Sequence, residues 1–216
     1  MLFRSEPASR AILVSSPGSS EGKTINVTNL AIALAQNDYK TIIVDADMRK
    51  PRVHKIFSLG NDKGLSVHLT GNADIQDVVF ATEIPNLSVI PCGPIPPFPN
   101  ELVSGARFKA LIESLKGQYD YVIVDSPPGI VADAMVIASV VDGVVVVVRS
   151  GMTSRRHLKM FFEQMQQANS KVLGVILNDV ESKMRYGYNY YSYRYKYGYK
   201  YYGSSKEGSD VQKAAS

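Results

Sequence analysis

The chain has 216 residues, a hydrophobic fraction of 45%, a net charge of +4, one cysteine and no tryptophan. This length suits one domain followed by a tail, and the hydrophobic fraction is sufficient for a packed core, so wholesale disorder is excluded. A single cysteine, Cys92, excludes an internal disulfide framework and favours a reducing, cytoplasmic setting. The N-terminal residues lack the apolar region of a signal peptide, and no apolar run reaches the ~18 residues of a membrane span.

The positive charge is concentrated near the C-terminus. Residues 183–216 carry seven Lys or Arg and two Asp or Glu, so this segment is +5 and residues 1–182 are −1. A uniformly basic surface for binding nucleic acid is therefore not indicated, and no nucleic-acid partner is expected. We expect two parts, a folded domain over residues 1–182 and a flexible tail over residues 183–216.

Short β-branched runs alternate along the chain with segments of helical periodicity. The predicted strands are Ala11–Ser15, Thr41–Val44, Leu87–Ile90, Tyr121–Val124, Val144–Val148 and Val172–Leu177. The predicted helices are Lys23–Gln36, Ala106–Leu115 and Ser154–Ala168. The strands are apolar on both faces, as buried parallel strands are. This alternation predicts an α/β fold, a mostly parallel sheet with helices on both faces.

A loop rich in small residues, SPGSSEGKT over residues 16–24, follows the first predicted strand and precedes the first predicted helix. A loop that ends in Gly-Lys-Thr between a strand and a helix is typical of a phosphate-binding P-loop, although Pro17 stands where glycine is usual. Lys23 would supply positive charge to the phosphates, and Thr24 would offer an oxygen to Mg²⁺. The residues of this loop expected to bind the cofactor are Gly18, Ser19, Ser20, Glu21, Gly22, Lys23, Thr24 and Ile25.

Carboxylates stand where two of the predicted strands end. Asp45 and Asp47 follow the second strand, and Asp125 follows the fourth. Ligands bind at the carboxyl ends of the strands in open α/β sheets, and Mg²⁺ prefers oxygen ligands. We therefore predict a metal site made by Thr24, Asp45, Asp47 and Asp125. Asp133 is open to two interpretations, because it could equally be the N-cap of the following helix.

The end of the last predicted strand bears on the choice of nucleotide. Leu177-Asn178-Asp179 does not match the Asn-Lys-x-Asp sequence that reads guanine, so ATP is the expected nucleotide. Asn178 is a candidate for contacting the edge of the base.

The tail has an unusual composition. Ten of the 13 tyrosines of the chain lie between residues 186 and 202, a stretch with no Val, Ile, Leu, Met or Phe. Such a stretch cannot build a core, and we expect it to be mobile. These tyrosines are Tyr186, Tyr188, Tyr190, Tyr191, Tyr193, Tyr195, Tyr197, Tyr199, Tyr201 and Tyr202.

Taken together, several segments resemble the catalytic domain of the bacterial tyrosine kinases tied to capsule and exopolysaccharide synthesis. They are PGSSEGKT, the stretch IIVDADMRKP over residues 42–51, the stretch VIVDSPP over residues 122–128, and the tyrosine-rich C-terminus. The stretch from Asp45 to Pro51 is similar to the Walker A′ motif of that family, and Asp125 to its Walker B carboxylate. The resemblance extends from about residue 10 to residue 202 and implies a P-loop NTPase fold.

The resemblance also implies an activity and partners. The activity is ATP-dependent phosphorylation of the ten clustered tyrosines, usually between subunits of a ring that forms on activation. The implied partners are a membrane-anchored activator that serves as a polysaccharide co-polymerase, and a cognate phosphotyrosine phosphatase. The protein would then lie in the cytoplasm, at the inner face of the membrane through its partner.

The expected catalytic residues are Lys23, Asp45, Asp47 and Asp125. Lys23 would contact the β- and γ-phosphates, and Asp125 would order the water shell of the metal. Asp45 and Asp47 would share metal contact and acceptance of the phenol proton, and the residues alone do not divide these two roles between them.

The sequence leaves two other functions to compare with this one. A partitioning or septum-positioning ATPase of the same P-loop class usually has a second lysine five residues before the invariant one, where this chain has Gly18. A tail that binds single-stranded nucleic acid by stacking could use the tyrosines together with Arg194, Lys196 and Lys200. The near-exclusive use of tyrosine argues against it, since phenylalanine and tryptophan stack equally well.

Overall fold

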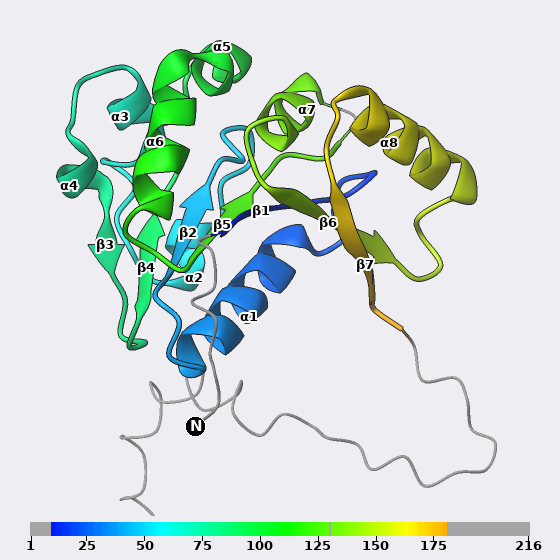
Figure 1. Ribbon diagram of the computed structural model, residues 1–216, viewed down its shortest axis with the longest axis horizontal. Helices are drawn as coiled ribbons and strands as arrows, with labels where there is room; N and C mark the ends of the chain where they lie inside the picture. The colour runs from blue at the N-terminus through cyan, green and yellow to red at the C-terminus, as the bar shows by residue number, and fades with distance from the viewer. Residues whose placement is uncertain (1–9, 130, 181–216) are drawn as a thin grey trace, which may run out of the picture. The chain divides into compact units, whose positions relative to one another are not determined.

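A computed structural model describes residues 10–129 and 131–180. They form a seven-stranded sheet in the order β3-β4-β2-β5-β1-β6-β7 (Figure 1). Every neighbouring pair of strands is parallel except β3 and β4, which are antiparallel. The strands are β1 (Arg10–Ser15), β2 (Thr41–Asp45), β3 (Phe80–Ala81), β4 (Leu87–Ile90), β5 (Tyr121–Asp125), β6 (Gly143–Arg149) and β7 (Val172–Asn178).

Helices cover both faces of this sheet (Figure 1). One face packs against α1 (Lys23–Gln36) and α2 (Val53–Ile56), and the other against α6 (Ala106–Lys116), α7 (Ala132–Ala138) and α8 (Arg155–Gln167). The remaining helices are short. They are α3 (Leu65–Leu69), α4 (Ile75–Val78) and α5 (Pro99–Ser104).

The alternation of side chains along each strand explains why the strands are apolar throughout. On β2, Ile42 and Val44 belong to the core under α6, whereas Ile43 belongs to the core under α1. Successive residues of a strand point to opposite faces, and both faces are covered here, so every position of β2 is buried. The predicted fold class is confirmed.

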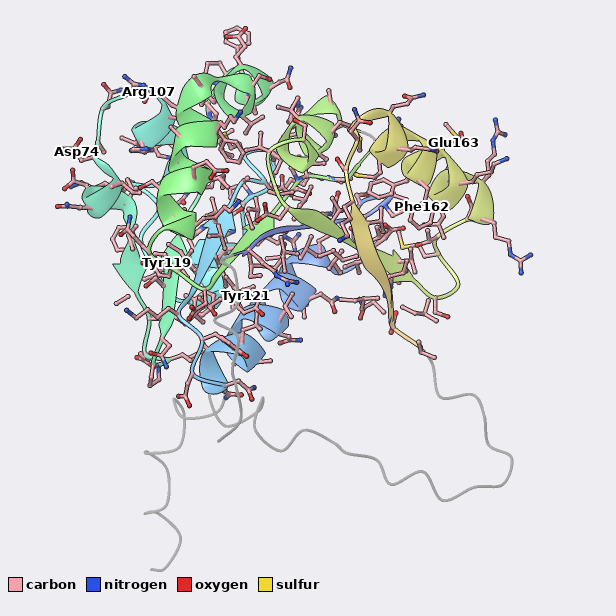
Figure 2. All side chains as sticks on the ribbon, viewed as in Figure 1. Asp74, Arg107, Tyr119, Tyr121, Phe162 and Glu163 are labelled. Atoms are coloured by element: carbon pink, nitrogen blue, oxygen red, sulfur yellow. The ribbon has the colours of Figure 1, made fainter. Side chains whose placement is uncertain are left out.

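Surface and core residues alternate on the helices as well. On α8, Phe162 packs against the core under α6, whereas its neighbour Glu163 pairs with Lys159 at 3.8 Å on the exposed side (Figure 2). Ser154 caps this helix, because its hydroxyl accepts a hydrogen bond of 3.2 Å from the backbone N–H of His157. The N-cap of α7, in contrast, is Val131, so the interpretation of Asp133 as a cap is wrong.

The central strand β1 pairs with two strands that come much later in the chain. Arg10 is in register with Tyr121 of β5, and Ile12 with Gly143 of β6, so the partners follow about 110 and 130 residues later. The predicted phosphate-binding loop begins at the carboxyl end of β1. Its position therefore depends on both of these distant strands.

All six predicted strands and all three predicted helices exist, with ends within one residue of those expected. The sequence reasoning missed β3 and the helices α2 to α5, which have two to six residues each and are too short to show a period. The predicted tail lies outside the described residues, so its boundary at residue 183 stays a prediction. Within residues 10–129 and 131–180, no helix has the length and apolar character needed to cross a bilayer.

Candidate nucleotide-binding site

The loop of residues 16–22 joins β1 to α1, and its last residue needs to be glycine for two reasons. Gly22 caps α1 in the left-handed conformation with φ of 98°, which an L side chain rarely adopts. A Cβ atom at this position would also lie 2.1 Å from Nδ2 of Asn178. The first N–H groups of α1, which have no acceptor within the helix, follow this loop directly, as in a phosphate-binding site.

Lys23, the first residue of α1, is buried among carboxylates. Burial lowers the pKa of its ammonium, whereas the charges of Asp125, Asp47 and Glu21 act in the opposite direction. An ammonium held in this way at a helix N-terminus can meet phosphate oxygens without reorganisation of its surroundings. Sequence reasoning predicted Lys23, Asp45, Asp47 and Asp125 as one catalytic group, and their electrostatic interactions show that the structure brings them together.

Asp125 ends β5 and is completely buried. Within the part of the chain that the structure describes, neither of its carboxyl oxygens has a hydrogen-bond partner of ordinary geometry. Burial raises the pKa of Asp125 to about 7, although the nearby Thr24 hydroxyl and Lys23 ammonium favour the ionised form. A buried carboxylate with two free oxygens is costly in isolation, and such groups occur where a ligand supplies the missing partners.

Asp45 ends the neighbouring strand β2 in register with Asp125. Its Oδ2 accepts a hydrogen bond from the backbone N–H of Val53 at 3.1 Å, and its Oδ1 accepts one from that of Asp47 at 3.3 Å. Burial and the charge of Asp125 raise the pKa of Asp45 well above its usual range. The carboxylate thus holds both ends of the loop between β2 and α2.

The same loop is tightened by Asp47. Its Oδ1 accepts hydrogen bonds from the backbone N–H groups of Lys50 at 3.0 Å and Arg49 at 3.3 Å. Arg49 then leaves the loop and pairs with Asp133 of α7, with 2.9 Å between Nε and Oδ2. Asp133 is buried, and this ion pair joins the loop after β2 to the helix that follows β5.

The side chain of Glu21, one of the residues expected to bind the cofactor, contacts other parts of the protein. Its buried side chain accepts a hydrogen bond from the backbone N–H of Gly18 at 2.8 Å and another from the hydroxyl of Thr153. Thr153 in turn accepts one from the backbone N–H of Arg149 at 2.8 Å. The carboxylate therefore braces the loop against the segment between β6 and α8, and sequence reasoning found no signal for this contact.

Asn178, a candidate for contacting the base, anchors the same loop. Its Nδ2 donates to the backbone oxygen of Glu21 at 2.9 Å. Beside it lies a cavity of about 350 Å³ lined by Arg149, Ser150, Gly151, Met152 and Asp179. Arg149 crosses from this cavity to the loop, with an ion pair of 2.7 Å to Asp179 and a hydrogen bond of 3.3 Å to the backbone oxygen of Ser20. The cavity offers space for a planar ring next to the loop.

Thr24 and Asp125 fit a magnesium ion that is coordinated mainly by the phosphates of a nucleotide, and not one coordinated by several carboxylates. The described residues contain no group of three or more His, Cys, Asp or Glu that could hold a metal ion by themselves. Mg²⁺ usually keeps several waters and uses one or two carboxylates together with substrate phosphates. The orphaned oxygens of Asp125 beside Thr24 suit this arrangement.

Two further sets of predicted site residues remain. Ile25, which was expected to bind the cofactor, has an exposed side chain. The ten tail tyrosines, which were expected to accept phosphate, lie outside the described residues.

Comparison with known proteins agrees with this geometry. Residues 9–178 match the family model described as an AAA domain. The tyrosine-protein kinase CpsD of Streptococcus agalactiae is 42% identical over 181 residues, which cover 82% of this chain and 79% of CpsD. The putative tyrosine-protein kinase CapB of Staphylococcus aureus is 35% identical over 192 residues, covering 88% of this chain and 84% of CapB.

A solved structure is similar over most of its length as well. The kinase domain of the Escherichia coli tyrosine kinase ETK superposes with a TM-score of 0.80 at 32% identity, covering 85% of this chain and 72% of that domain. The family model, which spans residues 9–178, includes the loop after β1 and the ends of β2, β5 and β7.

Proposed function

Since the chain belongs to the bacterial tyrosine kinases, protein-tyrosine kinases with a P-loop NTPase fold, we propose that it transfers the γ-phosphoryl group of ATP to its own tyrosine cluster. The observation that carries this proposal is the burial of Lys23 between Asp47 and Asp125 at the N-terminus of α1. The acceptors are the ten tyrosines from Tyr186 to Tyr202. Modification of this cluster would regulate the synthesis and export of capsule or exopolysaccharide.

The proposed binding mode places the phosphates of ATP in the loop of residues 16–22 and its base in the cavity beside Asn178. Lys23 would hold the β- and γ-phosphates with the backbone N–H groups of the loop. The brace formed by Glu21 supports this mode, because it fixes the loop without using the free N–H groups at the start of α1.

Thr24 and Asp125 would hold a magnesium ion, with Asp45 and Asp47 nearby. Bound there, the ion would neutralise charge on the β- and γ-phosphates. Asp45 and Asp47 stay candidates for both metal contact and proton acceptance. Asp45 accepts a backbone hydrogen bond on each of its two oxygens, which favours a positioning role for this carboxylate. Asp47 accepts its two backbone hydrogen bonds on Oδ1 alone, which leaves Asp47 as the better candidate proton acceptor.

In the proposed reaction, a tyrosine oxygen forms a bond to the γ-phosphorus as the bond to the oxygen bridging the β- and γ-phosphorus breaks. ADP leaves with that oxygen, and the phenol proton passes to a carboxylate. A phenol has a pKa of about 10 and is a weak nucleophile at neutral pH. Alignment and charge neutralisation therefore supply most of the rate.

The partners follow from the family. We propose a membrane-anchored activator that is also a polysaccharide co-polymerase, a cognate phosphotyrosine phosphatase, and a ring of subunits in the activated state. Through the activator the protein would lie at the inner face of the cell membrane. Several phosphotyrosines, at about −1.5 to −2 each, would turn a tail of +5 strongly acidic and could thus alter assembly.

The test is mass spectrometry of the full chain after incubation with ATP and Mg²⁺, compared with the Lys23→Met variant. Removal of one charge-stabilising group from a site of this kind lowers the rate by about 10²- to 10³-fold. We expect phosphate on tail tyrosines in the unaltered chain and nearly none in the variant. Equal tail phosphate in both proteins would overturn the proposed mechanism, and ATP hydrolysis without phosphotyrosine would favour a partitioning-type ATPase.

A further inference from the structure

The strand β7 has a free edge in the part of the chain that the structure describes. It is the last strand in the sheet order, and within the described residues it pairs only with β6. Its sequence, VLGVILN, contains neither charge nor proline. Proteins usually protect an edge strand with charged residues, proline or a covering element, because its free backbone groups can pair with another chain. The edge of β7 is therefore open to addition of a strand.

One face of β7 is also apolar and exposed. Val175 and Leu177 are in register with Val146 and Val148 of β6, and register partners point to the same face of a sheet. Val146 and Val148 are buried in the core under α6, α7 and α8, whereas Val175 is 50% exposed and Leu177 is 58% exposed. The helices on this face of the sheet thus cover these residues of β6 and leave Val175 and Leu177 of β7 exposed. We call Val175 and Leu177 the β7 patch.

The β7 strand leads directly to the nucleotide site. Its last residue, Asn178, donates the hydrogen bond of 2.9 Å to the loop at Glu21, and the next residue, Asp179, lines the neighbouring cavity. A segment added to the free edge of β7 would therefore run past the β7 patch to the place where the phosphates are expected.

The tyrosine cluster has the pattern of a strand. Between residues 191 and 201 a tyrosine occupies every second position. The intervening positions hold Ser192, Arg194, Lys196, Gly198 and Lys200. Alternation with period two predicts a strand with one aromatic and one polar face, and tyrosine is enriched in strands. Pairs of aromatic and β-branched side chains on neighbouring strands stabilise a sheet.

We propose that residues 191–201 of a second copy of this chain add to the free edge of β7 as an extra strand, with their tyrosines on the β7 patch. This inference rests on the proposed function and names how the acceptor reaches the site. A chain that turned back on its own β7 directly after Val180 would run antiparallel to this strand, and its later tyrosines would lie away from the nucleotide site. A segment from a second copy can enter at the amino end of β7 and run toward the site.

Docking of this kind depends on the modification state of the tail. A phosphotyrosine carries about −1.5 to −2 charges, and burying such a group against Val175 or Leu177 without a partner is strongly unfavourable. The β7 patch therefore binds the unmodified tyrosine segment and releases the phosphorylated segment.

The first test is transfer between two full-length chains. The acceptor is isotopically labelled chain with Lys23→Met, and the enzyme is unlabelled chain that is unaltered or carries Val175→Lys or Val175→Thr. Ile95→Lys is the matched control, because Ile95 is 62% exposed on the loop before α5. We expect Val175→Lys in the enzyme to raise KM for the acceptor by about tenfold or more, the effect of losing a central apolar contact, and Val175→Thr by less. The rate of ATP hydrolysis and the Ile95→Lys control stay unchanged.

The same substitutions placed on the acceptor have no effect if the β7 patch of the enzyme binds the tail. Unchanged transfer by both Val175 variants overturns the proposal, and so does phosphate confined to the enzyme's own tail. A second test measures fluorescence anisotropy of a labelled peptide of residues 186–202 with the full-length Lys23→Met chain. We expect saturable binding that Val175→Lys and phosphorylation of the peptide weaken. Absence of binding overturns the docking surface, whereas absence of phosphotyrosine in the unaltered chain overturns the proposed function.

Discussion

Asp45 and Asp125 stand in register at the carboxyl ends of the neighbouring parallel strands β2 and β5, and both are completely buried. Their surroundings differ in one respect. Backbone N–H groups donate to both oxygens of Asp45, whereas among the described residues neither oxygen of Asp125 accepts a hydrogen bond of ordinary geometry, although the Thr24 hydroxyl is nearby. One carboxylate therefore organises the protein, and the other is available to a ligand.

The first prediction concerns pH. Burial raises the pKa of Asp125 to about 7, from a value of 3.8 in an unperturbed chain. The folded protein thus keeps this proton to higher pH than the unfolded chain. The contribution of this carboxyl to stability is greatest below the unfolded pKa and falls as pH rises toward about 7, by about 1.4 kcal/mol per pH unit.

Asp125→Asn should flatten this dependence. The measurement is urea unfolding of both proteins at about pH 5 and about pH 7.5, without nucleotide or Mg²⁺. The unaltered protein should lose stability between the two conditions and the variant should lose less. Asp45, whose pKa is raised as well, leaves a residual slope in the variant. An identical slope in the two proteins would contradict the assignment.

The second prediction separates the charge of Asp45 from its hydrogen bonds. Asp45→Ala leaves the backbone N–H groups of Asp47 and Val53 without their acceptor, whereas Asp45→Asn keeps one oxygen. An unsatisfied buried donor costs about 1–3 kcal/mol. Denaturant unfolding should therefore find the alanine variant less stable than the asparagine variant by about that amount. Equal stability of the two variants would mean that the hydrogen bonds do not hold the loop.

The third prediction is a double-mutant cycle between Gly22 and Asn178. Gly22→Ala alone suffers both the strained φ and the contact of 2.1 Å with the Asn178 amide. In an Asn178→Ala background the contact is gone and only the backbone cost of about 1–2 kcal/mol remains. Unfolding measurements should give a coupling free energy of about 1 kcal/mol or more. Strict additivity would show that the two residues do not meet.

The fourth prediction concerns the brace at Glu21. Glu21→Ala removes the acceptor of the Gly18 N–H and of the Thr153 hydroxyl, so the loop loses its fixed shape. Loss of a hydrogen bond to a charged group costs about 1.5–3 kcal/mol, and KM for ATP should rise by about tenfold or more. Thr153→Val should act in the same direction, and Thr153→Ser, which keeps the hydroxyl, should restore the kinetics. A failure of serine to rescue would argue against the brace.

Local patterns were sufficient to predict six of the strands and the three long helices of this fold. The β-branched runs and the apolar face of Lys23–Gln36 reflect burial of neighbouring residues, and such patterns can be read within a short window. The strand-end positions of Asp45 and Asp125 followed from the same reasoning, since parallel strands end at one edge of the sheet.

Contacts between distant residues could not be predicted in this way. Arg49 and Asp133 are 84 positions apart, and neither stands in a pattern that points to the other. Glu21 and Thr153 are 132 positions apart, and the type of residue at position 21 favours a solvated loop over a buried brace. Such pairs depend on how the loops pack once the sheet exists, and this packing leaves no period in the sequence.

The pairing of β1 with β5 and β6 has a consequence for biosynthesis. The loop and helix that receive the nucleotide are made early, but the strands that hold β1 follow about 110 and 130 residues later. At about 5–20 residues per second, the ribosome needs several seconds to supply them. A nascent chain that ends before β6 therefore has the complete loop sequence and still lacks the framework that shapes it, so competence to bind nucleotide arrives only after β6 has been made.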